Sequence, residues 1–224
     1  MANRAYLSIW AKNFTEATML DQFERLLETV PFSAERPGVT ELVIRAVDSS
    51  EAPLLERDLP SGSADAARVA SIAREHLNTD SAYEVQTHWD LWVYDVGLGR
   101  WQRRPQRLAI TCHGEEYDGG ACAELGHFHA DIGFEHFFTG HAGLLGSRSE
   151  GGAAPQHPAE AAFLAVMARP ENFQEYHQKT RENIQQLLDW MRALEAAVPS
   201  ECQQLWSEGE ENFEARLDEI LAVR

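Results

Sequence analysis

The sequence predicts an α+β fold, in which an antiparallel or mixed sheet of about five to seven strands has two helices on one face. Three observations support this class. Segments with alternating apolar residues are interleaved with segments of helical spacing in the first half of the chain. Their order is strand, helix, strand, short strand, helix, strand, which is a ferredoxin-like βαββαβ start. Residues 159–224 show mainly helical spacing, which predicts a C-terminal helical hairpin.

The first two strands and the first helix have clear local signals. Residues 4–10 alternate between the two faces of a strand, which predicts one buried side. A helix follows, because apolar residues recur at helical spacing between a cap at Asn13 or Thr15 and a stop at Pro31. The run of β-branched and apolar residues at 39–47 predicts the second strand.

The next segments complete the ferredoxin-like order. Residues 52–59 predict a short edge strand, because Pro53 cannot donate a hydrogen bond within a central ladder. Residues 61–78 predict the second helix, with Ser63 as its cap. The odd positions of residues 83–95 are aromatic, aliphatic or β-branched, which predicts a long strand with one face in the core.

Two further strands are predicted to extend the sheet. A glycine-containing turn at 97–100 leads into a strand at 107–114. Residues 126–141 then read as one long strand with phenylalanines on its core side. Histidines of three successive strands are therefore expected on the opposite, outward face of the sheet: His88, His113, and His127 with His129.

Composition divides the chain into three parts. Residues 1–145 hold the predicted sheet, and residues 146–158 are rich in glycine and proline, as is typical of a loop or linker. Residues 159–224 include a long helix at 172–198 and a final amphipathic helix at 213–221, which pack on the sheet or on a second subunit. A homodimer through residues 172–198 is the alternative, because this helix carries a narrow seam. The seam consists of Phe173, His177, Thr180, Ile184, Leu187, Met191, Leu194 and Val198.

The charge of the chain restricts its partners. Asp and Glu number 36 against 19 Lys and Arg, so the formal net charge is −17. Such a chain repels phosphate backbones, which excludes a nucleic-acid role without a concentrated basic patch. The one basic cluster in the sequence, at Arg100, Arg103, Arg104 and Arg107, is expected to serve solubility or local ion pairs. We expect instead a protein partner, and a basic one.

The ends and the cysteines indicate a cytoplasmic protein without a membrane segment. No apolar run has the length of a signal peptide or of the roughly twenty residues that cross a bilayer. Cys112, Cys122 and Cys202 are odd in number and widely spaced, which fits neither a disulfide framework nor a CxxC zinc motif.

One hypothesis is a metal site on the outward sheet face. His127 and His129 stand on the same face of a predicted strand, roughly 6–7 Å apart at the backbone, and both can reach one ion. Asp131 and Glu135 add carboxylates on that face. Imidazole and carboxylate ligands suit zinc or another divalent transition metal. A hydrated face with cross-strand hydrogen bonds is sufficient to explain the same four side chains without a metal.

The other hypothesis is a non-catalytic interaction protein without a cofactor. Trp92, Tyr94, His88 and His113 would form an amphipathic partner-binding patch, because such side chains tolerate both water and burial. Segments 87–95, 107–118 and 126–133 resemble the central sheet of small bacterial proteins, some of which are encoded beside toxin genes. This resemblance contains no catalytic motif and implies an acidic, immunity-like protein that binds a partner.

Overall fold

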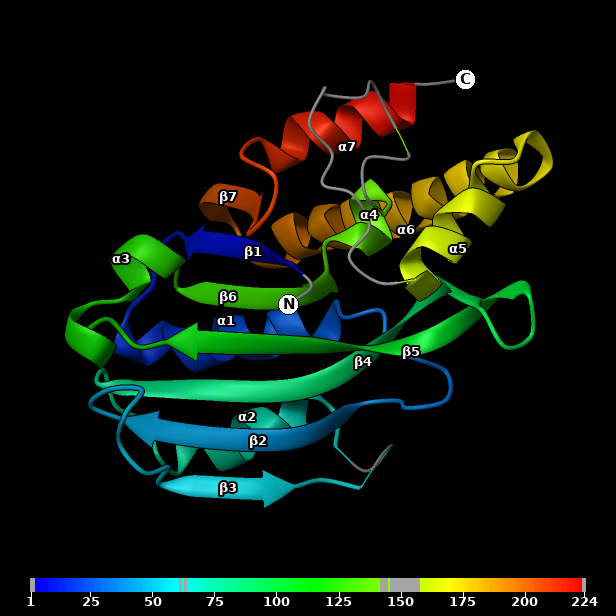
Figure 1. Cartoon of the computed structure of the whole chain (residues 1–224). Helices are drawn as coiled ribbons and strands as arrows, with labels where there is room; N and C mark the ends of the chain where they lie inside the picture. Colours follow the sequence, from blue (N-terminus) through cyan, green and yellow to red (C-terminus); the bar gives the residue numbers. More distant parts are fainter. Residues whose placement is uncertain (1–2, 61, 63, 142–144, 146–157, 223–224) are drawn as a thin grey trace.

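A seven-stranded antiparallel sheet organises the chain, and its strand order is β3-β2-β4-β5-β6-β1-β7. The computed structural model describes residues 3–60, 62, 64–141, 145 and 158–222 (Figure 1). The strands are β1 Arg4–Ala11, β2 Val39–Ala46, β3 Leu55–Asp58, β4 Ser81–Asp95, β5 Arg100–His113, β6 Phe128–Phe134 and β7 Ser200–Ser207. The α+β class and the predicted sheet are therefore confirmed.

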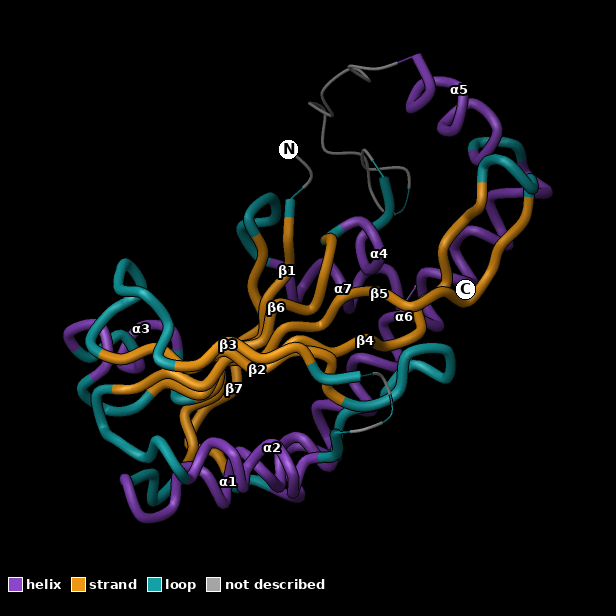
Figure 2. The backbone as a smooth tube through the Cα atoms, turned by 90° about the horizontal axis from the view of Figure 1, so that it is seen from below, coloured by secondary structure: helices purple, strands orange, loops and turns teal. Residues whose placement is uncertain are grey.

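Helices alternate with the strands along most of the chain. They are α1 Glu16–Glu28, α2 Ala66–Arg74, α3 Cys122–Leu125, α4 His136–Thr139, α5 Pro158–Met167, α6 Pro170–Ala197 and α7 Phe213–Ala222. Figure 2 shows α1 and α2 side by side on one face of the sheet. In the ranges that the structure describes, no helix is long and apolar enough to cross a membrane.

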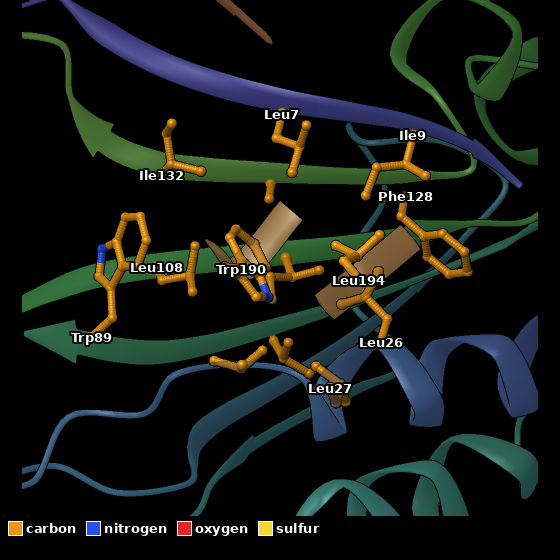
Figure 3. Close-up of a cluster of buried hydrophobic side chains, with 14 of the residues drawn as sticks. Leu7, Ile9, Leu26, Leu27, Trp89, Leu108, Phe128, Ile132, Trp190 and Leu194 are labelled. Atoms are coloured by element: carbon orange, nitrogen blue, oxygen red, sulfur yellow. The ribbon is translucent and has the colours of Figure 1, made fainter. Parts of the chain in front are cut away.

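The core lies between the sheet and these helices. Alternate residues of the central strands, such as Leu7, Ile110 and Ile132, are completely buried because they point toward α1 and α6. Figure 3 shows that Trp190 and Leu194 of α6 reach the same cluster as side chains of α1. The long helix α6 is thus part of the main core. Burial of its apolar side chains there stabilises the fold.

The strand order differs from a ferredoxin-like arrangement, so the predicted βαββαβ start is not confirmed. In that arrangement one strand separates the two parallel strands joined by the first helix. Here β4, β5 and β6 all lie between β1 and β2. The difference arises because β1 pairs with β6 and β7, which come more than a hundred residues later in the sequence.

The C-terminal segment contains a strand as well as helices, so the predicted helical hairpin is not confirmed. β7 lies between α6 and α7 in the chain and pairs with β1 from Ala5 to Ala11. It was not predicted, because its sequence, SECQQLWS, is mostly polar and only Leu205 in it is buried. Residues 146–157 of the predicted linker lie outside the described residues.

The predicted long strand at 126–141 is shorter than expected, and this prediction was wrong. β6 ends at Phe134, after Gly133 with φ +109°, and a helical turn, α4, begins at His136. Glycine adopts this positive φ readily, which lets the backbone leave the sheet. As a result, the second half of the stretch points its aromatic residues toward α6 rather than along the sheet.

Candidate functional site

The four residues predicted to bind a partner do not form one patch. His88 is paired with Arg107 on β5, and six positions along that strand separate Arg107 from His113. At about 3.3 Å per residue, His88 and His113 are therefore roughly 20 Å apart. Trp92 and Tyr94 lie further along β4, in the direction away from His113. The structure places these side chains in three separate environments.

The first environment is a row of histidine and aromatic rings on the outward sheet face. The ring centre of His129 lies 6.5 Å from that of His113 and 5.3 Å from that of Tyr6. Ser8 Oγ is 3.2 Å from His129 Nδ1. Burial, and then the charge of His113, lower the pKa of His129 to about 4. Burial also lowers the pKa of His113, so both rings are neutral near pH 7.

The predicted metal ligands Asp131 and Glu135 are engaged in separate contacts. Arg4 Nε and Nη2 donate to the two carboxylate oxygens of Asp131 at 2.6 and 2.7 Å, which is a bidentate ion pair. The Gly209 amide donates to Glu135 Oε2 at 2.9 Å. These two carboxylates thus join β6 to β1 and to the segment after β7.

His127 also has a structural partner. Its Nδ1 accepts a 3.0 Å hydrogen bond from the Ala11 amide, and its ring stacks on Phe14 with ring centres 4.1 Å apart. Within the described part of the chain, no three His, Cys, Asp or Glu side chains are grouped to hold an ion. The metal site therefore stays a prediction, and the contacts of His127, Asp131 and Glu135 explain these residues without it.

Another of these environments is a cavity of about 250 Å³ between the far ends of β4 and β5 and the helices α4, α5 and α6. Tyr94 and Trp92, which the sequence singled out, both lie in its wall. The remaining walls come from elements that are distant in sequence. The described lining residues are Trp92, Val93, Tyr94, Val96, Trp101, His136, Phe137, His141, Phe163, Tyr176, Thr180 and Asn183.

The length of two strands positions this aromatic cavity. β4 and β5 have 15 and 14 residues, so their paired ends extend past the neighbouring strands and pack against α5 and α6 (Figure 1). Asn183 of α6 fixes the junction: its Oδ1 accepts from the Trp92 amide at 2.8 Å, and its Nδ2 donates to the carbonyls of Trp92 and Phe137 at 3.1 and 3.0 Å. A buried amide that satisfies three backbone groups holds helix and strand in register.

Aromatic rings form most of the cavity wall. Tyr94 and Trp101 face each other across the β4–β5 hairpin with ring centres 5.5 Å apart. Trp101 stacks on Tyr176 at 5.5 Å, and Phe163 meets Tyr176 edge to face at 6.0 Å. Such offset and edge-to-face contacts add about 0.5–1.5 kcal/mol each to the free energy of burial, so the rings stabilise one another in this arrangement.

The polar groups in the wall contact one another. The His141 amide donates to Tyr176 Oη at 2.6 Å, and this hydroxyl lies 2.9 Å from His141 Nδ1, to which it can donate its own proton. Burial raises the pKa of Tyr176. The ring of His136 lies 4.1 Å from that of His141, and burial, then the charge of His141, lower the pKa of His136 to about 3.

These features define what the aromatic cavity can hold. Its described lining residues include no carboxylate, amine or thiol. A charged group would lose its hydration there without a countercharge, whereas an uncharged planar or aliphatic group would gain contacts with rings on several sides. The arrangement is suited to binding an uncharged group.

The sequence indicated two lining residues of the aromatic cavity, Trp92 and Tyr94, and did not indicate the others. A signal was present for Trp101, because a hairpin turn at 97–100 places it opposite Tyr94. His136, His141 and Tyr176 gave no comparable signal, since only tertiary packing brings them together. Comparisons of this chain with protein-family models, with curated proteins and with solved structures found no match.

Proposed function

We propose that this protein is a non-catalytic interaction protein that anchors an uncharged aromatic or aliphatic side chain of a basic protein partner in the aromatic cavity. The observation that carries the proposal is the ring-lined wall, without a described carboxylate or amine, around about 250 Å³ of space. Interface energy concentrates in a few apolar side chains that enter desolvated pockets. A preformed pocket of this kind supplies such a position.

The size of the aromatic cavity favours a side chain over a larger ligand. Sites for drug-sized molecules usually enclose roughly 300–1,000 Å³. The present cavity lies just below this range, at about 250 Å³. Its wall of mutually packed rings reduces the ordering cost of binding, because few side chains have to be immobilised when the partner arrives.

The charge of the molecule favours a basic partner. A net charge of −17 creates a negative potential that accelerates encounter with cationic surfaces and slows encounter with anionic ones. Neutralisation of a basic toxin, as in an immunity-like role, is one function of this type. The negative charge of the chain is the feature that supports the immunity-like role.

Three peptides of equal length test both parts of the proposal. One has a tyrosine flanked by lysines, the second has alanine in place of the tyrosine, and the third has glutamates in place of the lysines. The lysine-flanked tyrosine peptide is expected to bind at least about tenfold more tightly than either of the others by isothermal titration calorimetry. If the alanine peptide binds as tightly as the tyrosine peptide, the tyrosine is not an anchor. If the glutamate peptide binds as tightly, the protein does not select a basic partner.

A pair of variants locates the binding site of that peptide. Phe163→Ala removes part of the cavity wall and is expected to weaken tyrosine-peptide binding about tenfold. Phe32→Ala is the matched control, because Phe32 is likewise a partly buried phenylalanine packed against the core and is not part of the cavity wall. The same loss in both variants would show that the peptide binds elsewhere.

The alternative functions have less support. A metal-dependent role through His127 and His129 stays a prediction, and metal analysis of tag-free protein is the direct measurement. The homodimer through residues 172–198 also stays a prediction. Within one chain, Ile184, Leu187 and Leu194 of this helix are already fully buried against the sheet.

A further inference from the structure

A second, polar cleft lies against the same two strands and shares no lining residue with the aromatic cavity. It encloses about 570 Å³ and is bordered by β5, by the buried His88 of β4 and by the loop that follows α1. Its described lining residues are Glu35, Arg36, His88, Gln102, Arg103, Arg104, Pro105, Gln106 and Arg107. We refer to it as the arginine cleft.

The charge of the arginine cleft is opposite to that of the molecule. Its lining has four arginines and one carboxylate, which gives a formal charge of 4 − 1 = +3, in a chain whose net charge is −17. Like charges repel, so four guanidinium groups collected in one concave surface are unfavourable unless an anion lies between them. The expected role in solubility does not account for a concentration of this sign.

Most of these guanidinium groups have no carboxylate partner in the protein. Arg104 pairs with Asp95, but Arg103 donates to two uncharged oxygens, the carbonyl of Asp90 and Oε1 of Gln186. Arg36 Nη1 lies 3.3 Å from the neutral ring of His88. The guanidinium group of Arg107, which pairs with His88 through the strand backbone, has neither a hydrogen bond nor an ion pair among the described residues. Three of the four positive charges are thus available to a ligand.

The loop that carries Arg36 is held in place before any ligand arrives. The Ser33 amide donates to the His88 carbonyl at 2.7 Å, and the Ala34 amide donates to Asp90 Oδ2 at 3.0 Å. The Arg36 amide donates to Ser33 Oγ at 3.2 Å. These bonds fix the loop to β4, so the arginine cleft is preorganised on both sides.

His88 supplies a buried, neutral ring to the lining of the arginine cleft. It is 7% exposed, and burial, followed by the charges of Arg36 and Arg107, lowers its pKa. Because Nε2 accepts from Arg36, the neutral ring carries its proton on Nδ1. That buried Nδ1 has no partner among the described residues. Because Nδ1 is buried, a ligand in the cleft meets the neutral ring of His88 and the guanidinium group of Arg36 that bonds to it.

We propose that the arginine cleft binds a small multivalent anion of the phosphate class. Guanidinium groups match phosphate oxygens in planar, bidentate geometry, and several of them can share one phosphate or two linked phosphates. The cleft volume of about 570 Å³ is within the usual range for small ligands. A long polyanion such as RNA is disfavoured, because the surrounding surface belongs to a chain of net charge −17.

Inorganic pyrophosphate is the probe, and its binding to the full chain is followed by isothermal titration calorimetry and by the ³¹P NMR line width at low ionic strength. Saturable binding with one site per chain is expected. The Arg36→Ala/Arg107→Ala variant is expected to bind at least about tenfold more weakly. Its melting temperature should remain near the wild-type value, because alanine keeps the backbone bonds of both residues. In the described chain the guanidinium group of Arg107 has no hydrogen bond or ion pair, and that of Arg36 bonds to the neutral ring of His88.

Arg57→Ala is the matched control, because Arg57 is an exposed arginine on the edge strand β3, outside the arginine cleft. It should bind pyrophosphate as the wild type does. The proposal is overturned if pyrophosphate binding is absent or unsaturable, or if Arg57→Ala weakens it as much as the double variant does. Citrate, titrated in parallel, distinguishes phosphate from carboxylate recognition: tighter binding of citrate than of pyrophosphate would overturn the phosphate assignment.

Discussion

At the scale of single residues, His136 couples the aromatic cavity to pH. Burial, and then His141, lower its pKa to about 3 in the folded protein, whereas an unfolded chain has a histidine pKa of about 6.5. Below about pH 6.5 the unfolded state therefore binds a proton that the folded state does not. The resulting stability is present above that pH and is lost, by up to about 1.4 kcal/mol per pH unit, as the pH falls toward about 3.

Replacement of His136 by phenylalanine keeps a ring and removes this titration. Between about pH 6.5 and about pH 4, the free energy of unfolding of His136→Phe should fall less steeply than that of the wild type, as measured by urea unfolding. His76→Phe, at a partly exposed position after α2, is the control and should follow the wild-type slope. If the free energy of unfolding falls equally steeply with pH in His136→Phe and the wild type, the pKa of His136 is not lowered by folding.

At the scale of elements, the contact between α6 and β4 depends on Asn183. This side chain is 2% exposed and satisfies two backbone groups of Trp92 and one of Phe137. Asn183→Ala leaves three buried polar groups without partners and should lower the free energy of unfolding by about 2–4 kcal/mol. Asn172→Ala removes a single bond, to the Val166 carbonyl at 2.9 Å, and should cost about 1 kcal/mol. Similar losses in the two variants, measured by urea unfolding, would contradict this assignment.

The same helix shows what the sequence can and cannot predict. Apolar spacing predicted the helix and buried residues such as Leu187, and alternation likewise predicted β1 and most of β4. The seam omitted Tyr176, Asn183 and Trp190, which are all buried. The spacing of apolar residues does not indicate whether a polar or amphipathic side chain is buried. Its burial depends on a partner from another element. Strand order was unpredictable for a related reason, because β1 pairs with strands that lie far away in sequence.

The candidate sites also combine local features, which the sequence predicts, with tertiary contacts, which it does not. The ring pair at the β4–β5 hairpin is a local feature, and the sequence indicated Tyr94 correctly as part of an aromatic surface. The arginine cleft needed the fold, because Arg36 reaches the β5 arginines only through the loop that β4 holds in place. The histidine row was expected from strand alternation, but its relation to His88 depended on register along two long strands.

At the scale of the whole molecule, ionic strength should have opposite effects on stability and on anion binding. With a net charge of −17, repulsion among acidic side chains destabilises the compact state near pH 7. An increase in salt from about 20 to about 200 mM shortens the screening length to below about 10 Å and should raise the melting temperature. Pyrophosphate affinity for the arginine cleft should fall over the same range, because the attraction between guanidinium and phosphate is screened as well.

A second pH separates this charge effect from a specific ion effect. The sequence pI is about 4.9, so at that pH the net charge, and with it the net repulsion, is close to zero. The rise in melting temperature with salt should therefore disappear near the pI and be clear near pH 7, when both are followed by circular dichroism with sodium chloride. If the melting temperature rises equally at both pH values, salt acts through apolar burial or through a bound ion, and self-repulsion does not limit the stability of this acidic chain.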